Sequence, residues 1–369
     1  MFRNYQYRLK PTAEQEIALD FLFWQGRKVW NEALAQRIAI YEEKRGNLNA
    51  MDQWPRFRDL RSSEPDALGK LSASAMNYVL RRLDKAFNAF YRRVKEKKSK
   101  PGFPHFKNRY TFNSLEFKYG NGCKLRYDKT NNPWLYVMNV GLIKLTYHRP
   151  IPNDATAKQI VIRRHANEWD VSIMLQTPDV QNKRAFTGQD VGVDTGLLSL
   201  LAYSDGTLVD NPRWLRESLV KLRVLNRRAA RQVKGSKRQK QTYAQIAKLH
   251  NHIANQRKDF WHKITRGLVV DYDLIAIEDM TYAFMNQSKH LARSSYDAAL
   301  GMFKPLLAYK AEETGARLAI VNPRNTSQLC SGCGEVVGKN LKVRIHRCSN
   351  CGLTINRDVN AARNILRLA

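Results

Sequence analysis

Three acidic residues in the C-terminal half of the chain are candidates for chemistry. In QDVGVDTG, Val191 and Val193 indicate a buried strand that ends at Asp194, and in DLIAIEDM a second buried strand ends at Glu278. Asp358 falls in the first turn of a helix predicted in NRDVNAARNILRL. Because α/β sheets hold ligand groups at the carboxyl ends of their strands, Asp194 and Glu278 are well placed for chemistry. The order of elements described below would bring all three acids to one sheet edge.

A cluster of this kind favours hard divalent cations. Neighbouring carboxylates raise one another's pKa values unless a cation neutralises them. Mg²⁺ prefers oxygen ligands, and a pair of such ions about 3.5–4 Å apart can activate water and stabilise the leaving oxygen of a phosphodiester. The sequence therefore predicts metal-assisted phosphodiester hydrolysis by Asp194, Glu278 and Asp358, with Mg²⁺ as cofactor.

Each acid also has a structural interpretation. Asp194 fits a turn at a strand end, and Asp358 fits a residue that complements the helix dipole. Because neighbouring strand residues face opposite sides, only one of Glu278 and Asp279 can join the cluster. Asp190 shares the parity of Asp194 but lies at the other end of its strand.

The V-D-x-G turn and the hairpin after it also fit the phosphate loop of an actin-like ATPase. That interpretation requires a second loop of the same type, which the sequence lacks, and a less basic protein. GxxxxGK[ST], GxGxxG and HExxH are absent as well, which argues against P-loop, Rossmann and zincin chemistry.

Two CxxC pairs, each followed by Gly, are separated by 14 residues near the C-terminus. Their members are Cys330, Cys333, Cys348 and Cys351. This spacing predicts one structural Zn²⁺ in a tetrahedral site of four thiolates. His346 is a weaker candidate ligand and is expected at the surface, and Cys123, the fifth cysteine, is expected to act as a small hydrophobic residue. Because the second pair ends shortly before Asp358, loss of zinc should disorder the third acid.

The composition points to a folded protein with a polyanionic partner. Among 369 residues, 63 Lys and Arg stand against 33 Asp and Glu, a net charge of +30, and 43% of residues are hydrophobic. Nucleic acid is the expected partner, rather than a membrane or a small-molecule substrate. The start MFRNYQYRLK does not resemble a secretion signal, so we expect a cytoplasmic protein with reduced cysteines.

Basic charge is concentrated in residues 213–266, which hold 16 Lys and Arg and two Asp and Glu. This basic arm is predicted to form two helices around VKGSKRQK, with Leu215, Leu219 and Leu222 packed against Ile246, Leu249 and Ile253. A solvated helical face is the alternative. The candidate nucleic-acid contacts are Arg227, Arg228, Arg231, Lys234, Lys237 and Arg238.

The predicted secondary structure changes twice along the chain, from helices to short strands and then to a mixture of strands and helices. Residues 12–43 and 71–98 are predicted helices, the second capped by Ser72 or Ser74 and packed through a stripe that runs from Met76 to Val94. Short segments from Tyr110 to Pro178 predict a β-meander, closed into a small barrel. After Gly188 we predict three strands joined by hairpins, followed by helix, strand, helix (294–315), strand, the cysteine insert and a last helix. This is the order of elements in an RNase H-like α/β fold.

The motifs GVDTGLLSLLAYSDG, LIAIEDM and RCSNCGLTINRDVNAARNILRL, with the long stretch from SKHLARSS to CSGCG, resemble TnpB, the transposon-encoded OrfB family ancestral to type V CRISPR effectors. The resemblance covers about residues 188–369, and GFPHFK at 102–107 is similar to a stretch of the same family. It implies a RuvC-like nuclease that is directed by a guide RNA from the transposon end and cuts double-stranded DNA beside a short adjacent motif. By motif position, Asp194, Glu278 and Asp358 correspond to the family's metal-binding catalytic acids, and the four cysteines to its zinc ribbon.

The resemblance also implies a multidomain α+β architecture. Residues 1–10 and 110–185 would form a wedge-like β-barrel into which a helical recognition lobe, 11–109, is inserted. Residues 186–369 would form the RuvC-like nuclease domain, with the basic arm at 213–266 and the zinc ribbon inserted at 325–355. Two other functions are considered: a guided DNA-binding repressor without nuclease activity, as in relatives that have lost acids, and a DNA transposase that needs no RNA.

Overall fold

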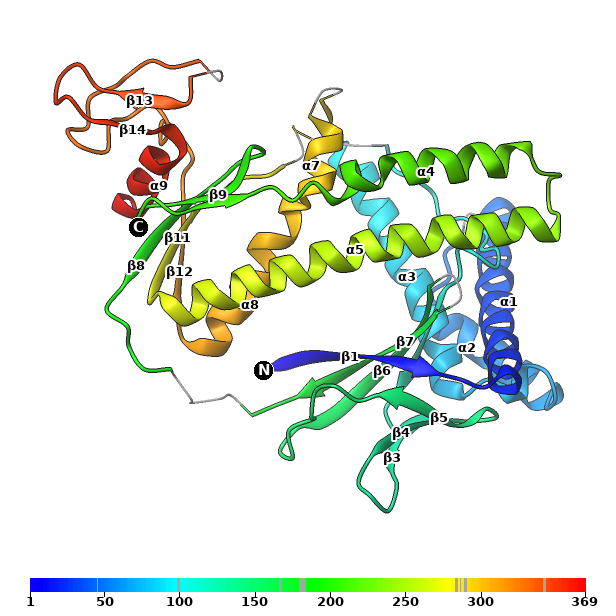
Figure 1. Cartoon of the computed structure of the whole chain (residues 1–369). Helices are drawn as coiled ribbons and strands as arrows, with labels where there is room; N and C mark the ends of the chain where they lie inside the picture. Colours follow the sequence, from blue (N-terminus) through cyan, green and yellow to red (C-terminus); the bar gives the residue numbers. More distant parts are fainter. Residues whose placement is uncertain are drawn as a thin grey trace. The chain divides into compact units, whose positions relative to one another are not determined.

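The chain forms two compact units, Met1–Asp179 and Val180–Ala369, in the computed structural model (Figure 1). The boundary lies close to the predicted change of pattern before Gly188. The structure describes residues 1–44, 46–97, 100–165, 168–178, 184–282, 285, 287–288, 291–340 and 343–369. Each unit is described by itself below.

The helices of the first unit are α1 (Ala13–Lys44), α2 (Ala50–Ser63) and α3 (Ala73–Glu96). Ser72 caps α3, since its hydroxyl accepts a hydrogen bond from the Ala75 amide at 3.2 Å, which confirms one of the two predicted caps. The sequence interpretation missed α2, although Asn49 and Asp52 form a capping box there. Val94 is exposed, contrary to the predicted stripe, because the buried face of α3 ends at Phe87.

The strands of this unit are β1 (Phe2–Lys10), β2 (Ser114–Lys118), β3 (Cys123–Tyr127), β4 (Pro133–Val137), β5 (Gly141–Thr146), β6 (Thr156–His165) and β7 (Glu168–Gln176). They form one curled antiparallel sheet in the order β2-β6-β7-β1-β5-β4-β3. A simple meander is therefore wrong, because the N-terminal strand lies between β7 and β5. Alternation along β1 gives it one apolar face, and Tyr5, Tyr7 and Leu9 on this face are all buried in the core.

One apolar core joins the helices and the sheet of the first unit. It includes Leu34 of α1, Leu83 of α3 and Ile173 of β7, all fully buried. Cys123 also lies in this core at 1% exposure, as expected for a small hydrophobic residue, and burial raises the pKa of its thiol. An isolated bridge connects Tyr119, the residue after β2, with Cys123 at the start of β3.

The second unit contains a mixed five-stranded sheet in the order β10-β9-β8-β11-β12. Its strands are β8 (Asp190–Thr195), β9 (Ser199–Tyr203), β10 (Leu208–Asp210), β11 (Leu274–Glu278) and β12 (Arg317–Val321). β8, β11 and β12 run parallel, and β9 and β10 are antiparallel hairpin strands. Along the chain, these strands and the helices between them follow the predicted order of elements, and the unit is α/β on a mixed sheet as expected.

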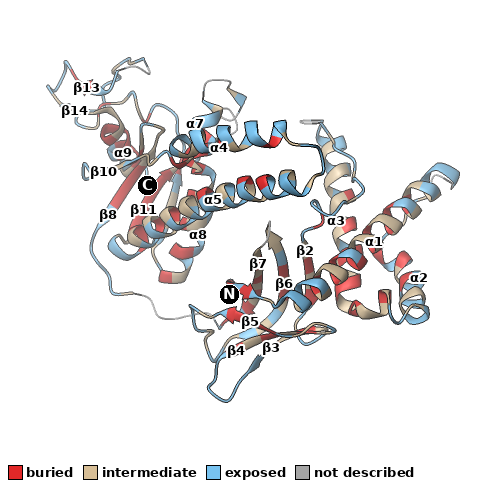
Figure 2. Ribbon diagram, turned by 45° about the vertical axis from the view of Figure 1, so that its right-hand side comes forward, coloured by how far each residue is buried: buried red, intermediate tan, exposed pale blue. Residues whose placement is uncertain are grey.

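Helices cover both faces of this sheet, and Figure 2 shows the buried strands between them. They are α5 (Lys237–Asp271) and α8 (Phe303–Thr314) on one face and α9 (Arg357–Arg367) on the other. Val191, Val193 and Ile277 pack in the core formed with α5 and α8, whereas Ala276 packs with Ile365 of α9. Because side chains alternate along a strand, Asp194 and Glu278 fall on the same face as α9.

The basic arm consists of α4 (Trp214–Arg231) and the first part of α5, which is 35 residues long. Leu222, Ile246 and Ile253 pack between the two helices as predicted, and the end of α5 continues onto the sheet. Leu219 instead lines a cleft described below. The predicted helix at 294–315 is interrupted. The helix α7 (Ala292–Ala298) is followed by Ala299, whose positive φ of 51° breaks the helix before α8 begins.

Gly192 lets α9 approach the sheet. A Cβ at this position would lie 2.0 Å from the Ala362 carbonyl oxygen and 2.8 Å from the Leu366 amide nitrogen, both backbone atoms. Neither atom can rotate away, so any side chain on β8 at this point must displace the whole helix.

The substitution Gly192→Ala is expected to lower the free energy of unfolding by about 3 kcal/mol, the upper range for overpacking, because α9 must shift. Urea denaturation of the full chain measures this change. Gly301→Ala is the matched control, since a Cβ there meets nothing within 4 Å, and it should unfold like the wild type. Equal stability of the two variants would show that α9 does not pack this closely.

Candidate active site and metal centre

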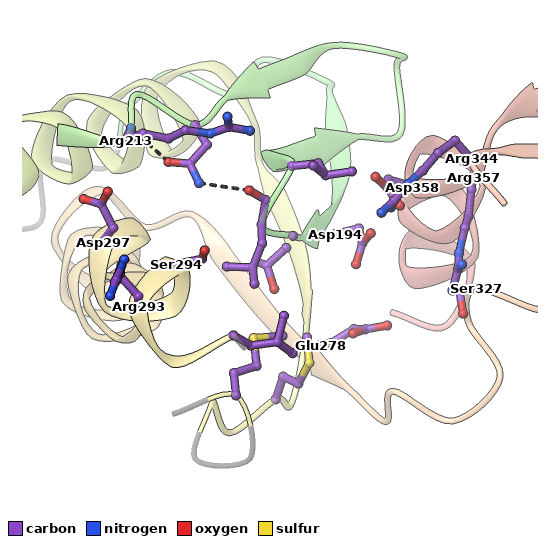
Figure 3. Close-up of a pocket in the computed structure, with 18 of the residues that line it drawn as sticks. Asp194, Arg213, Glu278, Arg293, Ser294, Asp297, Ser327, Arg344, Arg357 and Asp358 are labelled. Atoms are coloured by element: carbon purple, nitrogen blue, oxygen red, sulfur yellow. Dashed lines mark hydrogen bonds between the residues drawn. The ribbon is translucent and has the colours of Figure 1, made fainter. Parts of the chain in front are cut away.

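The three predicted acids line one cleft of about 1,110 Å³ in the second unit (Figure 3). Asp194 comes from the end of β8, Glu278 from the end of β11, and Asp358 from the first turn of α9. Asn356 begins α9, because its side chain accepts a hydrogen bond from the Asp358 amide at 2.8 Å. The fold therefore brings together residues that lie far apart in the sequence.

Glu278, and not Asp279, faces this cleft. Asp279 is exposed and forms an ion pair with Lys304 of α8 at 2.7 Å, on the opposite face of the sheet. Asp190, at the start of β8, accepts a hydrogen bond from the Leu274 amide at 3.1 Å and connects the two strands. Alternation thus separates Glu278 from Asp279, whereas Asp190 is separated from Asp194 by the length of β8.

The environment of Asp194 and Glu278 disfavours their charged forms. Burial, followed by the charges of Glu278 and Asp358, raises the pKa of Asp194 well above its usual range. Burial also raises the pKa of Glu278, although a hydrogen bond from Thr326 partly opposes this shift. Such a set of oxygen ligands fits a hard divalent cation, which would supply the missing positive charge.

Thr326 is a functional candidate that the sequence interpretation missed. Its hydroxyl donates a hydrogen bond to the Glu278 carboxylate and is itself only 3% exposed. The residue lies in the loop after β12, where its Thr-Ser context gives no distinctive signal. Because it holds one carboxylate oxygen, Thr326 fixes the rotamer of Glu278.

The wall opposite the acids carries cations. Arg213, Arg216 and Arg293 line the cleft, and their side chains are exposed. The carboxylate of Asp297, in the same wall, already has partners. It accepts hydrogen bonds from amides in the first turn of α4 and forms an ion pair with Arg257 at 2.9 Å. Arg344 and Arg357 also line the cleft, next to Asp358 (Figure 3), so arginines lie on both sides of the acids.

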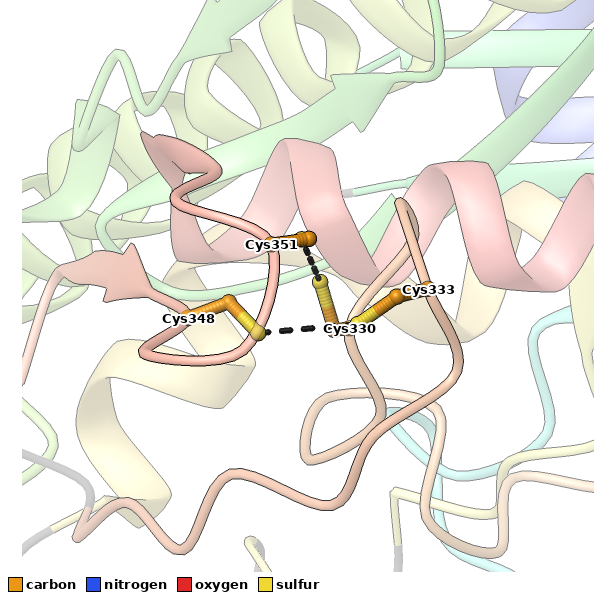
Figure 4. A group of neighbouring side chains, drawn as sticks. All are labelled: Cys330, Cys333, Cys348 and Cys351. Carbon is orange, nitrogen blue, oxygen red and sulfur yellow. Dashed lines mark hydrogen bonds between the residues drawn. The ribbon is translucent and has the colours of Figure 1, made fainter.

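The four predicted cysteines come together in a separate cluster (Figure 4). Their sulfur atoms all lie within 4.8 Å of one another, and both the Cys330–Cys351 and Cys333–Cys348 pairs are 3.6 Å apart. Four sulfurs placed about 2.3 Å from a tetrahedral Zn²⁺ would be about 3.8 Å apart. The cluster therefore has the dimensions of a four-thiolate metal site.

Both CxxC segments fold in the same way. The amides of Gly334 and Gly352 donate to the Cys330 and Cys348 carbonyls, and both glycines have positive φ, which explains the Gly after each pair. His346 lies on β13 (Ile345–Arg347), which pairs with β14 (Thr354–Asn356). The expectation that His346 is a surface residue is wrong, because it is fully buried beside Lys339.

Two buried asparagines tie α9 to the cysteine segment and to the cleft. Asn360 accepts a hydrogen bond from the Ser331 amide at 2.9 Å and donates to the Leu329 carbonyl at 2.7 Å. Asn364 donates to the Thr326 carbonyl at 2.9 Å. The helix that carries Asp358 is thus hydrogen-bonded to the first CxxC segment and to the residue that orients Glu278.

The six predicted nucleic-acid contacts all lie in the basic arm and are exposed. Arg227, Arg228 and Arg231 belong to α4, Lys234 lies in the connecting turn, and Lys237 and Arg238 begin α5. They lie around the α4–α5 turn, whereas the acids lie at the sheet. None of the helices in the described parts of the chain combines the length and the hydrophobicity needed to span a bilayer.

Three family models match the sequence. OrfB_IS605, described as "Probable transposase", matches residues 172–289, and "Cas12f1-like, TNB domain" matches residues 301–365. A "Helix-turn-helix domain" model of the same OrfB family matches residues 1–46. The described part of that last segment contains strand β1 and a single 32-residue helix, α1.

Two of the similar proteins match nearly the whole chain. A protein of Streptomyces pristinaespiralis named as an RNA-guided DNA endonuclease is 32% identical, over 99% of this chain and 88% of its own length. The RNA-guided DNA endonuclease InsQ of Escherichia coli (strain K12) is 28% identical, over 98% and 91%. Among solved structures, the protein of a Cas12f1–sgRNA–target DNA complex has a similar fold, with a TM-score of 0.59 and 13% identity over 99% of this chain and 98% of its own.

Proposed function

Since the chain belongs to the transposon-encoded OrfB (TnpB) family of RNA-guided DNA endonucleases, we propose that it cuts double-stranded DNA under the direction of a guide RNA. The observation that carries this proposal is the convergence of Asp194, Glu278 and Asp358 in one cleft. Full-length similarity to the Streptomyces protein supports the same function for the whole chain.

In this proposal the three carboxylates hold divalent metal, most simply Mg²⁺. The bound metal would activate the attacking water and stabilise the leaving oxygen of the phosphodiester. The carboxylates of Asp194, Glu278 and Asp358 supply the oxygen ligands, and Thr326 keeps Glu278 in the orientation it needs. Arg213, Arg216 and Arg293 give the opposite wall a charge that suits a phosphate backbone.

We assign a structural Zn²⁺ to the four cysteines. All four positions of a tetrahedral site would be filled by protein ligands, so this ion has no open position for chemistry. Its role is to fold the 325–355 segment, which precedes the helix that carries Asp358. The sulfur separations of 3.6 Å support this assignment.

The finer architecture belongs to the same proposal. The strand order of the second unit and its helices on both faces support an RNase H-like (RuvC) nuclease fold. The curled sheet of the first unit would be the wedge-like domain, and α1 to α3 its recognition lobe. In a nuclease of this kind, base pairing between the guide RNA and the target DNA recognises the sequence. The protein contacts the nucleic-acid backbone and a short motif in the DNA duplex.

The deciding experiment is to express the protein from its transposon locus, purify it in high salt and sequence the bound RNA. We expect one RNA with a constant part and a variable end that matches flanking DNA. This complex should then cut a plasmid library that carries the matching target beside randomised sequence, with Mg²⁺ present. Specific binding without cutting would favour the guided repressor, and strand-transfer products without RNA would favour the transposase.

We also propose that the exposed cations of the basic arm contact nucleic-acid phosphates. Replacing Arg227, Arg228 and Arg231 together by Gln should reduce the salt dependence of guide-RNA binding. Each lost contact should lower the slope of log K against log[salt] by about 0.7 for single strands and 0.9 for a duplex. Filter binding over a range of NaCl concentrations measures the slope, and an unchanged slope would assign these cations to solvent.

A further inference from the structure

A second cavity lies in the first unit, far in sequence from the three acids. It has a volume of about 240 Å³ and is lined by Asp20, Phe23, Trp24, Arg27, Arg109, Phe112 and Arg164. The lining therefore combines aromatic rings with three arginines and one carboxylate. Neither the acid cleft nor the cysteine cluster includes any of these residues.

Trp24 offers this cavity an open aromatic face. Its side chain is 45% exposed, and its contact with Phe21 is tilted, with ring centroids 5.7 Å apart. Phe23, by contrast, is buried and packs edge-on against Phe112 and Trp169. Among the described residues, no partner accepts a hydrogen bond from the Trp24 indole N–H. An exposed tryptophan without a polar partner is a large apolar surface left in water.

The charges of the cavity are unbalanced. Asp20 forms ion pairs with Arg109, at 3.2 Å, and with Arg164. Arg27 lies on the turn of α1 after Trp24 and has no ion-pair partner among the described residues. One carboxylate therefore fixes two guanidinium groups in place, and the cavity keeps an excess of positive charge.

We propose that this cavity binds one unpaired nucleotide, with the base stacked on Trp24 and the phosphate held by Arg27 and Arg109. Aromatic faces beside arginines are the usual means of holding single-stranded bases. The volume of 240 Å³ is below the ~300–1,000 Å³ of pockets that enclose whole small ligands, which fits one nucleotide of a longer chain. A base within a duplex is stacked on both sides and cannot reach the ring.

The choice of nucleic acid as the ligand rests on the proposed function and on the basic charge of the chain. An unpaired nucleotide of guide RNA and one of displaced DNA have the same stacking and phosphate chemistry. They differ in the 2′-hydroxyl and in the methyl group of thymine. The test below therefore uses both an RNA and a DNA probe.

The full chain, freed of bound RNA in high salt, is mixed with an eight-nucleotide oligo(U) that carries one 4-thiouridine, or with oligo(dT) that carries one 4-thiothymidine. Ultraviolet crosslinks are mapped to peptides, and affinity is measured by fluorescence anisotropy. We expect crosslinks on α1 around Trp24. Trp24→Ala should remove them and weaken binding by roughly 5- to 100-fold, whereas Trp24→Phe should keep most of both.

Arg27→Gln should lower the salt slope of binding by about 0.7, as expected for one phosphate contact with a single strand. Tyr127→Ala and Arg58→Gln are the matched controls, because both side chains are exposed and neither residue lines the cavity or lies next to one that does. They should leave binding and crosslinks unchanged.

Crosslinks with one probe only would identify the source of the nucleotide, and crosslinks with both would leave the site open to either strand. Crosslinks elsewhere, or binding that Trp24→Ala does not weaken, would overturn the inference. The oligonucleotide assay needs neither a guide nor cleavage, so a chain that fails to cut DNA could still carry this site.

Discussion

Replacing Asp194 by Asn is expected to lower the rate of guided DNA cleavage about 1,000-fold or more without weakening guided binding. The carboxylate is the proposed metal ligand on β8, and charge stabilisation by bound metal is worth several kcal/mol, with each 1.4 kcal/mol equal to a factor of ten. The amide keeps the size of the side chain and removes its negative charge. Single-turnover cleavage in Mg²⁺ and filter binding of target DNA measure the two properties separately.

The same substitution should stabilise the Mg²⁺-free protein near pH 7. The pKa of Asp194 is raised in the folded state, so the unfolded chain loses this proton at a lower pH, and ionisation costs folding stability once the pH exceeds the unfolded value. Asn carries no such cost. Thermal unfolding in Mg²⁺-free buffer, with the zinc content of both proteins checked, should therefore show a higher midpoint for Asp194→Asn than for the wild type.

Asp279→Asn is the control, because Asp279 lies one residue beyond Glu278 and pairs with Lys304 outside the cleft. Its cleavage rate should match that of the wild type. Cleavage that survives in Asp194→Asn, with protein free of contaminating nuclease, would remove Asp194 from the proposed metal site. Loss of cleavage in Asp279→Asn would show that the other face of β11 carries the chemistry.

Asp194 and Glu278 were predictable because each one follows an apolar run, and Asp358 because it lies in the first turn of a predicted amphipathic helix. Val191 and Val193 predict the strand before Asp194, and strand parity leaves one of Glu278 and Asp279 in the cluster. The sequence alone does not decide which of the two it is. The position of α9 decides it, because this helix covers the face that Ala276 and Glu278 share.

Features that depend on distant partners were not predictable. β1 takes a central place in its sheet by pairing with β7 and β5, strands more than a hundred residues away. The local pattern suggested a meander of the later strands, and only the resemblance to the OrfB family grouped residues 1–10 with them. Thr326 contacts Glu278 only because α9 and β11 lie on either side of its loop. His346 is buried by the fold of the cysteine segment, and a single polar residue in a basic stretch gives no sign of that burial.

Replacing Cys330 by Ser is expected to remove the proposed zinc and, with it, most DNA cleavage. Structural zinc sites contribute about 10–16 kcal/mol of apparent binding free energy in small domains, so the segment around the cysteines should lose its fold without the ion. RNA binding should persist, because neither the first unit nor the exposed cations of the basic arm depend on this segment. Zinc content by mass spectrometry, RNA binding and cleavage are the three measurements.

Cleavage should fall because the cysteine segment holds parts of the acid site in place. Ser331 follows Cys330 and is hydrogen-bonded to Asn360 of α9, and Asn364 of the same helix holds the loop of Thr326. Loosening this segment therefore releases both Asp358 and the group that orients Glu278. Cys123→Ala is the control, because it removes a buried thiol of the first unit and should leave zinc and cleavage intact. Full cleavage by zinc-free Cys330→Ser would show that α9 keeps its place through its contacts with the sheet alone.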